Sequence, residues 1–293
     1  MASELFIGIT SWNSQMFLPT CLQAIRATTA HLQVRVCVVD NVSSDSSARI
    51  AEEHGAEVIS RSCTQPEALN LLLRRSREPH TLLMHADVVL LHPHWYELCQ
   101  ARLSPEVALV SPEDIGCGPL TRPFGVGKPE SSFLFFRTEA LRRCRRLVWH
   151  RHSRIPLPRR EFNFSGGHVT HNMPALLERE GLGWFPMKVH VSNREEIPLY
   201  VPSEPPPIWS EELGHLRYGL GNFYGIGDDV THYHNWYDRV VSRTPQPEGS
   251  GKLRREFPGE FIRQYSERFL ADYQAGRVDL PRDLHAVRVP QAL

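Results

Sequence analysis

Short apolar runs alternate with amphipathic segments through the first third of the chain. The apolar runs predict strands at 5–10, 34–39, 57–60, 81–84 and 107–110. Helical spacing of apolar residues predicts helices at 18–29, 46–54, 66–75 and 93–103, with Gly55 ending the second. Strands that alternate with helices of about ten residues predict an α/β fold, in which a mostly parallel sheet carries helices on both faces.

The second half of the chain is less regular. Its pattern predicts a strand at 132–136, helices at 139–146 and 172–180, a strand from Trp184 and a final helix at 257–274. The stretch 201–207 is a proline-rich connector, and 219–227 is glycine-rich. Because the glycines of 219–227 do not fit G-x-G-x-x-G and follow no predicted strand, we expect a flexible loop over a site there.

Composition narrows the class of protein. A chain of 293 residues with 41% hydrophobic and 23% charged residues can form one large α/β domain with an elaborated C-terminal part. The net charge of zero and the isoelectric point near 7.3 argue against a nucleic acid or an anionic membrane as an obligatory partner. We expect the arginine-rich stretch 142–160 to be a solvated face.

The cysteines and the apolar runs indicate in which cellular compartment the protein is expected. None of the six cysteines forms a C-x-x-C pair, so we expect scattered reduced thiols and a cytoplasmic protein. No secretory leader pattern opens the chain. The longest apolar stretch, 81–91, is interrupted by His85 and Asp87 and is too short to span a bilayer. A soluble protein is expected, with peripheral membrane association left open.

Polar clusters follow three of the predicted strands, at 10–13, 40–44 and 85–87. Ligands of open α/β sheets bind at the carboxyl ends of strands, so we expect one shared site. Asp40 can bind a base or a ribose there, and the alternative is an Asx turn with Ser43 or Asp45 capping the next helix. Both hold if Asp45 caps while Asp40 binds. His85 and Asp87 point the same way along a strand and suit a divalent cation; a satisfied histidine and a helix-capping aspartate are the alternative.

Two further clusters carry candidate chemistry. The run 228–234 holds Asp228, Asp229, His232 and His234, which are possible metal ligands, although a polar surface loop fits equally well. Gly166 and Gly167 precede two histidines of the run 166–171. These histidines, His168 and His171, can bind an acceptor or act as a base, or be structural.

Three motifs together resemble those of family-2 glycosyltransferases of the GT-A fold, especially bacterial members similar to rhamnosyltransferases. T-S-W-N at 10–13 is similar to the family's P-T-Y-N, and V-V-D-N-V-S-S-D at 38–45 to its V-V-D-N-G-S-x-D. L-M-H-A-D-V at 83–88, followed by P-H-W at 93–95, is similar to the D-x-D strand end and its downstream P-x-W. The resemblance covers about the first 110 residues, with order and spacing kept.

The resemblance implies a site for a nucleotide-sugar, with Asp40 against the base, most often uracil. It places the donor among Thr10, Ser11, Trp12, Asn13, Asp40, Asn41, Ser43, Gln65, His85 and Ala86. Asp87 is then the main ligand of Mn²⁺ or Mg²⁺, and His232 or His234 completes the metal site. It also implies a donor-binding half at 1–111, an acceptor-binding and metal-completing half at 112–240, and a C-terminal helix and tail at 241–293.

Two departures from the family pattern affect the expected mechanism. His85 replaces the first acid of D-x-D. The acidic pair that supplies the base in inverting members is missing, because residues 168–172 read H-V-T-H-N. A histidine (His168 or His171), a carboxylate (Glu161, Asp228 or Asp229) or a retaining mechanism remain as alternatives.

The function implied is hexosyl transfer, dependent on a divalent metal, from a UDP- or dTDP-sugar to a hydroxyl of a glycan, lipid-linked sugar, small molecule or modified nucleic acid. The missing acidic pair keeps a degenerate, non-catalytic protein that binds a nucleotide-sugar or glycan as an alternative. A nucleotidyltransferase fits less well, because 10–20 contains no glycine, lysine or arginine for a phosphate loop. A nucleic-acid-modifying transferase would use the 142–160 arginines, against which the neutral charge argues.

Overall fold

The structure is a computed structural model of the chain, and it describes residues 4–113, 127–143, 170, 173–191, 218, 221–235 and 259–280. The candidate bases His168, His171 and Glu161, the connector at 201–207 and most of the arginine-rich stretch lie outside the described residues.

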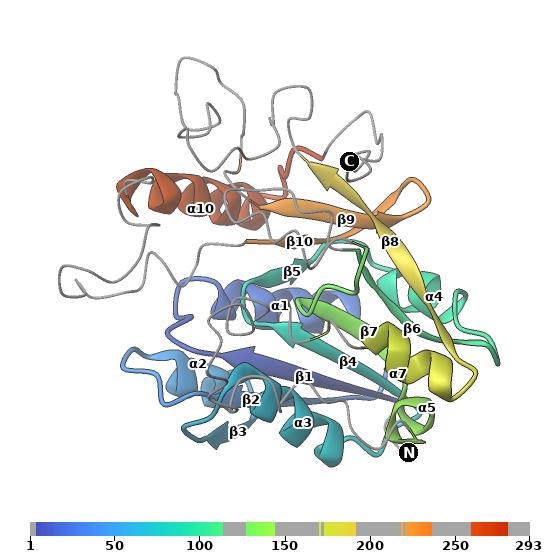
Figure 1. Cartoon of the computed structure of the whole chain (residues 1–293). Coiled ribbons are helices and arrows are strands. Elements are labelled where there is room, and N and C mark those ends of the chain that lie inside the picture. Colours follow the sequence, from blue (N-terminus) through green and yellow to red (C-terminus); the bar gives the residue numbers. More distant parts are fainter. Residues whose placement is uncertain are drawn as a thin grey trace, which may run out of the picture.

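The N-terminal part of the sheet is the parallel unit that the sequence predicts (Figure 1). Its strands are β1 (Leu5–Ser11), β2 (Val34–Asp40), β3 (Glu57–Ser60) and β4 (His80–His85). The helices between them are α1 (Leu18–Thr28), α2 (Ser47–Glu53) and α3 (Gln65–Arg75). β1 lies between β2 and β4 and is parallel to both, and β2 is parallel to β3. The periodicity therefore located each of these elements to within about two residues.

The rest of the described chain extends this sheet with strands of both directions. Its strands are β5 (Val88–Leu90), β6 (Val107–Pro112), β7 (Phe133–Arg137), β8 (Gly183–Val191), β9 (Asn222–Ile226) and β10 (Asp229–His234). Its helices are α4 (Trp95–Gln100), α5 (Thr138–Arg143), α7 (Met173–Arg179) and α10 (Gly259–Gln274).

These strands make one sheet of mixed direction with the first four. The order is β3-β2-β1-β4-β7-β6-β8-β9-β10-β5. β7 runs antiparallel between β4 and β6, and β9 and β10 form an antiparallel hairpin that β5 extends. The α/β class is confirmed, but parallel pairing is confined to β3-β2-β1-β4 and to β6 with β8, because β7 and the hairpin enter in the opposite direction.

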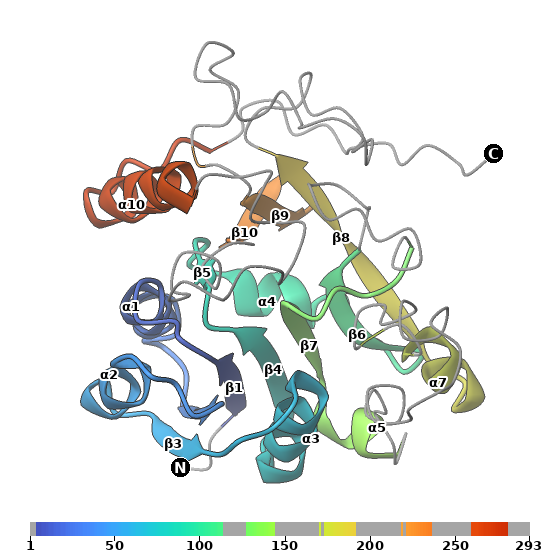
Figure 2. The same ribbon diagram turned by 60° about the vertical axis from the view of Figure 1, so that its left-hand side comes forward.

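Helices cover both faces of the sheet, as the sequence predicts (Figure 2). Along β1, Leu5, Ile7 and Ile9 enter one core, with α1, α2, α4 and α10, and Phe6 enters the other, with α3, α5 and α7. Side chains of a strand alternate between its two faces, so a strand buried on both sides reads as a continuous apolar run. This explains why LFIGITS is buried at all seven positions.

Local signals set the helix ends that matter for the site. α3 begins with a capping box, in which the Glu67 carboxylate accepts the backbone N–H of Thr64 at 2.8 Å. This cap places Gln65, the first residue of the helix, at the sheet edge. Gly55 has φ of +79°, which confirms it as the end of α2.

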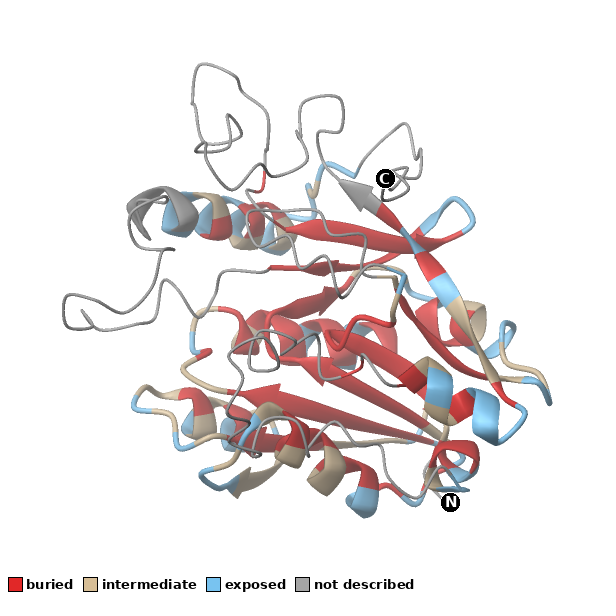
Figure 3. Cartoon of the chain, in the orientation of Figure 1, coloured by how far each residue is buried: buried red, intermediate tan, exposed pale blue. Residues whose placement is uncertain are grey.

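The glycine-rich stretch is a strand, which corrects the expected flexible loop at 219–227. Residues 222–226 form β9, and all five are buried (Figure 3). Phe223 packs with Tyr233 of β10, and the Tyr233 ring stacks on Phe269 of α10 at 3.8 Å between centroids. Gly221 lies so close to the Tyr233 ring that no Cβ would fit. Gly221 thus allows aromatic packing that sequence periodicity did not reveal.

The proposed division at residue 111 falls inside a continuous structural unit. β6 pairs with β7 and β8, and β4 pairs with β7, so strands on both sides of residue 111 share one sheet. Phe269 of α10 packs against Phe17 of the N-terminal part at 6.4 Å between centroids. The three-part division stays a prediction about function.

Candidate donor and metal site

The three predicted polar clusters meet at one edge of the sheet. In the register of β1 with its neighbours, Thr10 lies opposite His85 and Ser11 lies opposite Asp40. The chain continues in the same alignment, because Asn41 N–H donates to Ser11 O at 2.8 Å and Ala86 N–H donates to Thr10 O at 3.1 Å. Neighbouring strands lie about 4.8 Å apart. Asp40 and His85 therefore lie on either side of the end of β1.

Hydrogen bonds join the loops after β1 and β2. Asn13 N–H donates to Ser43 Oγ at 2.8 Å, and Asn13 Oδ1 accepts the Ser44 N–H at 2.8 Å. Ser43 also donates to both Asp40 oxygens, through its hydroxyl at 2.5 Å and its N–H at 2.9 Å. Asp40 thus closes this loop through Ser43, three residues on, whereas the Asx turn that the sequence allowed would bond the N–H two residues on.

Asp45 supports the start of the following helix. Its Oδ1 accepts the N–H of Ser47, the first residue of α2, at 2.9 Å, and its Oδ2 accepts the Gln15 N–H at 3.1 Å. Asp45 is therefore structural, and Asp40 is the carboxylate of this loop that lies at the strand end.

The other donor-binding candidates lie along the same edge. The buried hydroxyls of Thr10 and Ser11 have no hydrogen-bond partner among the described residues. Asn41 Oδ1 accepts the Cys63 N–H at 2.8 Å and so ties the ends of β2 and β3 together. Trp12 is partly exposed at the turn. The Gln65 side-chain amide lies 2.5 Å from Nε2 of His85.

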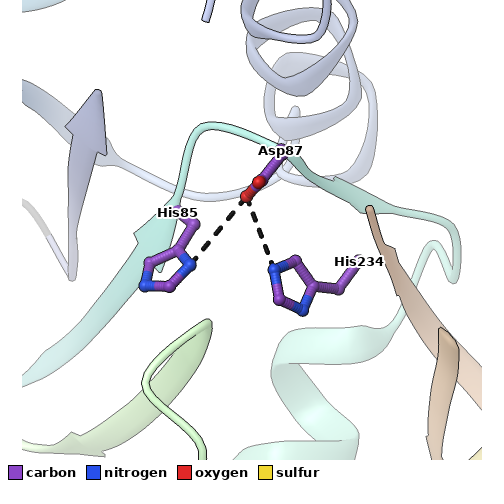
Figure 4. A group of neighbouring side chains, drawn as sticks. All are labelled: His85, Asp87 and His234. Carbon is purple, nitrogen blue, oxygen red and sulfur yellow. Dashed lines mark ion pairs between the residues drawn. The ribbon is translucent and has the colours of Figure 1, made fainter. Parts of the chain in front are cut away.

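Three buried side chains are placed to share a metal ion: His85, Asp87 and His234 (Figure 4). Asp87 Oδ1 is 3.5 Å from His234 Nε2 and 3.9 Å from His85 Nδ1. A carboxylate with two imidazoles suits Mn²⁺ and other first-row transition metals better than Mg²⁺, which prefers oxygen. The residues present therefore fit the divalent cation that the family resemblance implies.

The register of β10 on β5 decides which histidine reaches Asp87. His234 lies opposite Val88, next to Asp87, while His232 lies opposite Leu90. The His232 ring stacks instead on Phe133 at 4.3 Å and on Tyr224 at 5.0 Å between centroids. Burial of this ring lowers its pKa well below the usual value, with a smaller contribution from His234. Of the two predicted ligands, only His234 lies in the metal triad.

The carboxylate candidate Asp229 lies away from these groups. It begins β10, its side chain is 54% exposed, and it lies 3.7 Å from His92. Four residues of the strand lie between it and His234, which makes five steps of about 3.3 Å each. The structure does not bring Asp229 to the triad.

Glu130 is a site residue that the sequence analysis missed. It is buried, and its Oε1 lies 3.4 Å from His234 Nδ1. Its other oxygen accepts the Tyr224 hydroxyl at 2.8 Å. The polar run at 128–132, directly before an apolar strand, was the available signal. Since β7 is antiparallel to β4, its start lies beside the end of β4, where Ser132 O accepts the His85 N–H at 3.0 Å.

Two other sequence expectations concern location. Within the described ranges, no helix combines the length and the apolar character that crossing a bilayer requires. The cysteines at 21, 37, 63 and 99 are free thiols.

Part of this chain is similar to solved structures of two synthases. Glucosyl-3-phosphoglycerate synthase from Mycobacterium tuberculosis, in complex with Mn²⁺, UDP and glucosyl-3-phosphoglycerate, is similar at a TM-score of 0.40 and 18% identity, over 48% of this chain and 58% of that chain. Mannosyl-3-phosphoglycerate synthase from Rubrobacter xylanophilus is similar at a TM-score of 0.40 and 21% identity, over 47% and 55%. The chain thus spans less than two thirds of these proteins. A search of the curated proteins finds no match.

The sequence match is more direct than these structural likenesses. The family described as glycosyl transferase family 2 matches residues 6–162, which is more than half of the chain. This range includes all three motifs on which the resemblance was based. The mixed α/β sheet with helices on both faces agrees with the GT-A fold class expected for that family. The chain belongs to glycosyl transferase family 2.

Proposed function

We propose that this protein transfers a sugar, of the hexose class, from a nucleoside-diphosphate donor to a hydroxyl acceptor, and that it depends on a divalent cation. One observation carries the proposal. The triad of His85, Asp87 and His234 lies at the strand edge that also holds Asp40, with the end of β1 between them. A nucleoside diphosphate needs both a group that binds its base and a cation beside its pyrophosphate, and this edge offers both.

The family resemblance favours a uracil or thymine base, and thus a UDP- or dTDP-sugar, and the Asp40 carboxylate can accept a hydrogen bond from either base. Both bases carry an N3–H donor, which cytosine lacks. Ser43 already donates to each Asp40 oxygen, but each carboxylate oxygen has two lone pairs, so Asp40 can accept one more hydrogen bond. The hydroxyls of Thr10 and Ser11 have no hydrogen-bond partner among the described residues, and they lie at the end of the adjoining strand, one on each face.

The triad is suited to the leaving group. Asp87 and the two histidines would hold Mn²⁺, and they would bind Mg²⁺ more weakly. The bound cation would offset the charge of the departing nucleoside diphosphate. The protein's own contribution is to position the donor, with Asp40 and the β1 hydroxyls at the nucleoside end and Asp87 at the pyrophosphate end. Such positioning accounts for much of the acceleration of a two-substrate reaction.

Thermal unfolding with nucleotides tests this proposal. The protein is melted with UDP, dTDP, GDP or CDP, each with and without MnCl₂. We expect UDP or dTDP to stabilise it, strongly only when Mn²⁺ is present, by about 2.7 kcal/mol at a hundredfold excess over Kd. Asp87→Asn should lose the part of this stabilisation that depends on Mn²⁺, whereas the exposed control Asp228→Asn should keep it.

A second measurement separates the enzyme from a non-catalytic relative. Release of UDP or dTDP from the corresponding sugar donor is followed with Mn²⁺ present. We expect turnover that Asp87→Asn lowers by roughly a hundredfold or more, because several kcal/mol of leaving-group stabilisation is lost. Binding without turnover on any donor or acceptor would favour the non-catalytic alternative. A Mn²⁺-dependent stabilisation unchanged in Asp87→Asn would refute the metal site.

A further inference from the structure

Both histidines of the triad are contacted on both ring nitrogens. His234 directs Nε2 to Asp87 at 3.5 Å and Nδ1 to Glu130 at 3.4 Å. His85 directs Nδ1 toward Asp87 at 3.9 Å, and its Nε2 lies 2.5 Å from the Gln65 amide. In each ring, one nitrogen faces Asp87 and the other faces a side chain from another element.

We infer that Glu130 and Gln65 are positioning residues, which fix the tautomer and orientation of the two histidines for metal binding. The inference rests on the metal site of the proposed function. A histidine that binds a metal through one nitrogen carries its proton on the other, and an acceptor beside that proton fixes the ring. Glu130 lies beside Nδ1 of His234 and Gln65 lies beside Nε2 of His85, the two nitrogens that do not face Asp87.

The Glu130 carboxylate is itself held in position. Its Oε2 accepts the Tyr224 hydroxyl at 2.8 Å, and that hydroxyl also accepts the Asn222 side-chain N–H at 3.3 Å. Glu130, Tyr224 and Asn222 are all buried. The other oxygen therefore faces Nδ1 of His234 at 3.4 Å. A proton on Nδ1 points at this oxygen, and the Nε2 lone pair is then left toward Asp87.

Gln65 does the same for the other ring. A carboxamide can present its oxygen or its nitrogen to a neighbour. In the structure the amide nitrogen of Gln65 faces Nε2 of His85. Turning the carboxamide by 180° brings its oxygen to that place. Gln65 then accepts the proton of Nε2, and the Nδ1 lone pair is left on the Asp87 side. Ser131 Oγ, 3.4 Å from the same Nε2, is a second acceptor. The capping box of α3 fixes the position of Gln65 at the first residue of that helix.

Titration with MnCl₂, followed by the electron paramagnetic resonance signal of free Mn²⁺, tests the inference without relying on activity. We expect Glu130→Gln and Gln65→Met each to raise the Kd for Mn²⁺ by about 10- to 100-fold, the usual effect of losing such a partner. Tyr224→Phe should act in the same direction, but less. The matched control Glu97→Gln changes a half-exposed carboxylate of α4 that pairs with His31, and it should leave the Kd unchanged. Thermal melts without metal establish that each variant is folded.

Double variants distinguish positioning from general damage to the fold. If Glu130 acts through His234, Glu130→Gln causes no further loss in a His234→Ala background but keeps its effect in His85→Ala. Gln65→Met should cause no further loss in the His85→Ala background but keep its effect in His234→Ala. Equal effects in both backgrounds, or wild-type affinity in folded Glu130→Gln and Gln65→Met, would overturn the inference. Absence of Mn²⁺ binding by the wild-type protein would instead refute the metal site on which it rests.

Discussion

Nε2 of His234 lies 3.5 Å from Oδ1 of Asp87, across the pairing of β10 with β5. The backbone holds this relationship, because Asn235 N–H donates to Asp87 O at 3.0 Å. A β-hairpin from the C-terminal part thus completes a cluster that begins at the end of a parallel strand in the N-terminal part. The proposed metal site depends on the strand register as much as on the side chains that would bind the ion.

The triad has one carboxylate where the family motif has two, and this predicts its metal preference. His85→Asp restores the D-x-D pattern and replaces a nitrogen ligand by oxygen. We expect the ratio of Mg²⁺ to Mn²⁺ affinity to rise by roughly tenfold, the scale on which changes around a metal alter affinity. Competition between the two ions, measured by the resonance signal of free Mn²⁺, checks this. The exposed control His94→Asp should not change the ratio.

The loop that carries Asp40 contains a backbone strain that predicts a stabilising mutation. Val42 has φ of +52° and is 60% exposed, and the family motif has glycine at this position. A left-handed conformation costs a residue with a Cβ about 1–2 kcal/mol, while glycine loses about 0.5–1 kcal/mol in entropy on folding. Val42→Gly should therefore stabilise the protein by about 0.5–1 kcal/mol in urea unfolding.

Val42→Ala serves as the comparison for that mutation. It removes the β-branch but keeps the Cβ, so we expect a smaller gain than with glycine. A loss of stability in Val42→Gly would show that the valine side chain makes a contact that outweighs its strain.

His80 predicts a dependence of stability on pH. Its ring stacks on Phe135 at 5.6 Å and its Nδ1 lies 2.9 Å from the Tyr96 hydroxyl. Burial lowers its pKa, with a smaller contribution from Arg137. Between the lowered folded pKa and the unfolded value near 6.5, the unfolded state binds more protons, so stability falls as the pH drops below about 6.5.

Replacing the His80 ring tests the predicted direction of the change in stability with pH. His80→Asn has no group that titrates there, so its free energy of unfolding should fall less steeply than that of the wild type between pH 7.5 and 5.5. Urea unfolding at a series of pH values provides the comparison. Parallel curves for the two proteins would contradict the prediction, even if Asn lowers stability at every pH.

Much of the site could be predicted because its parts lie in regular local patterns. Asp40 and Asp87 follow apolar runs of strand length, and parallel strands with helical crossovers bring their carboxyl ends to one edge. Asp45 supports the start of α2, as the sequence allowed, and Asp40 closes its loop by accepting the Ser43 N–H. The β9–β10 hairpin was missed, because its glycines and histidines resemble a polar loop until the aromatic residues between them are seen to pack.

The sequence by itself determined the alternating strands and helices, the family, and the sheet edge that holds Asp40 and Asp87, because each depends on short-range periodicity or on contiguous motifs. Only the tertiary structure decided that His234 rather than His232 faces Asp87, and that Glu130 and Gln65 contact the two histidines. Those relationships depend on the register of β10 against β5 and on the antiparallel entry of β7 beside β4. Both are long-range pairings in which a shift of two residues would exchange the histidines while leaving the local pattern of each strand unchanged.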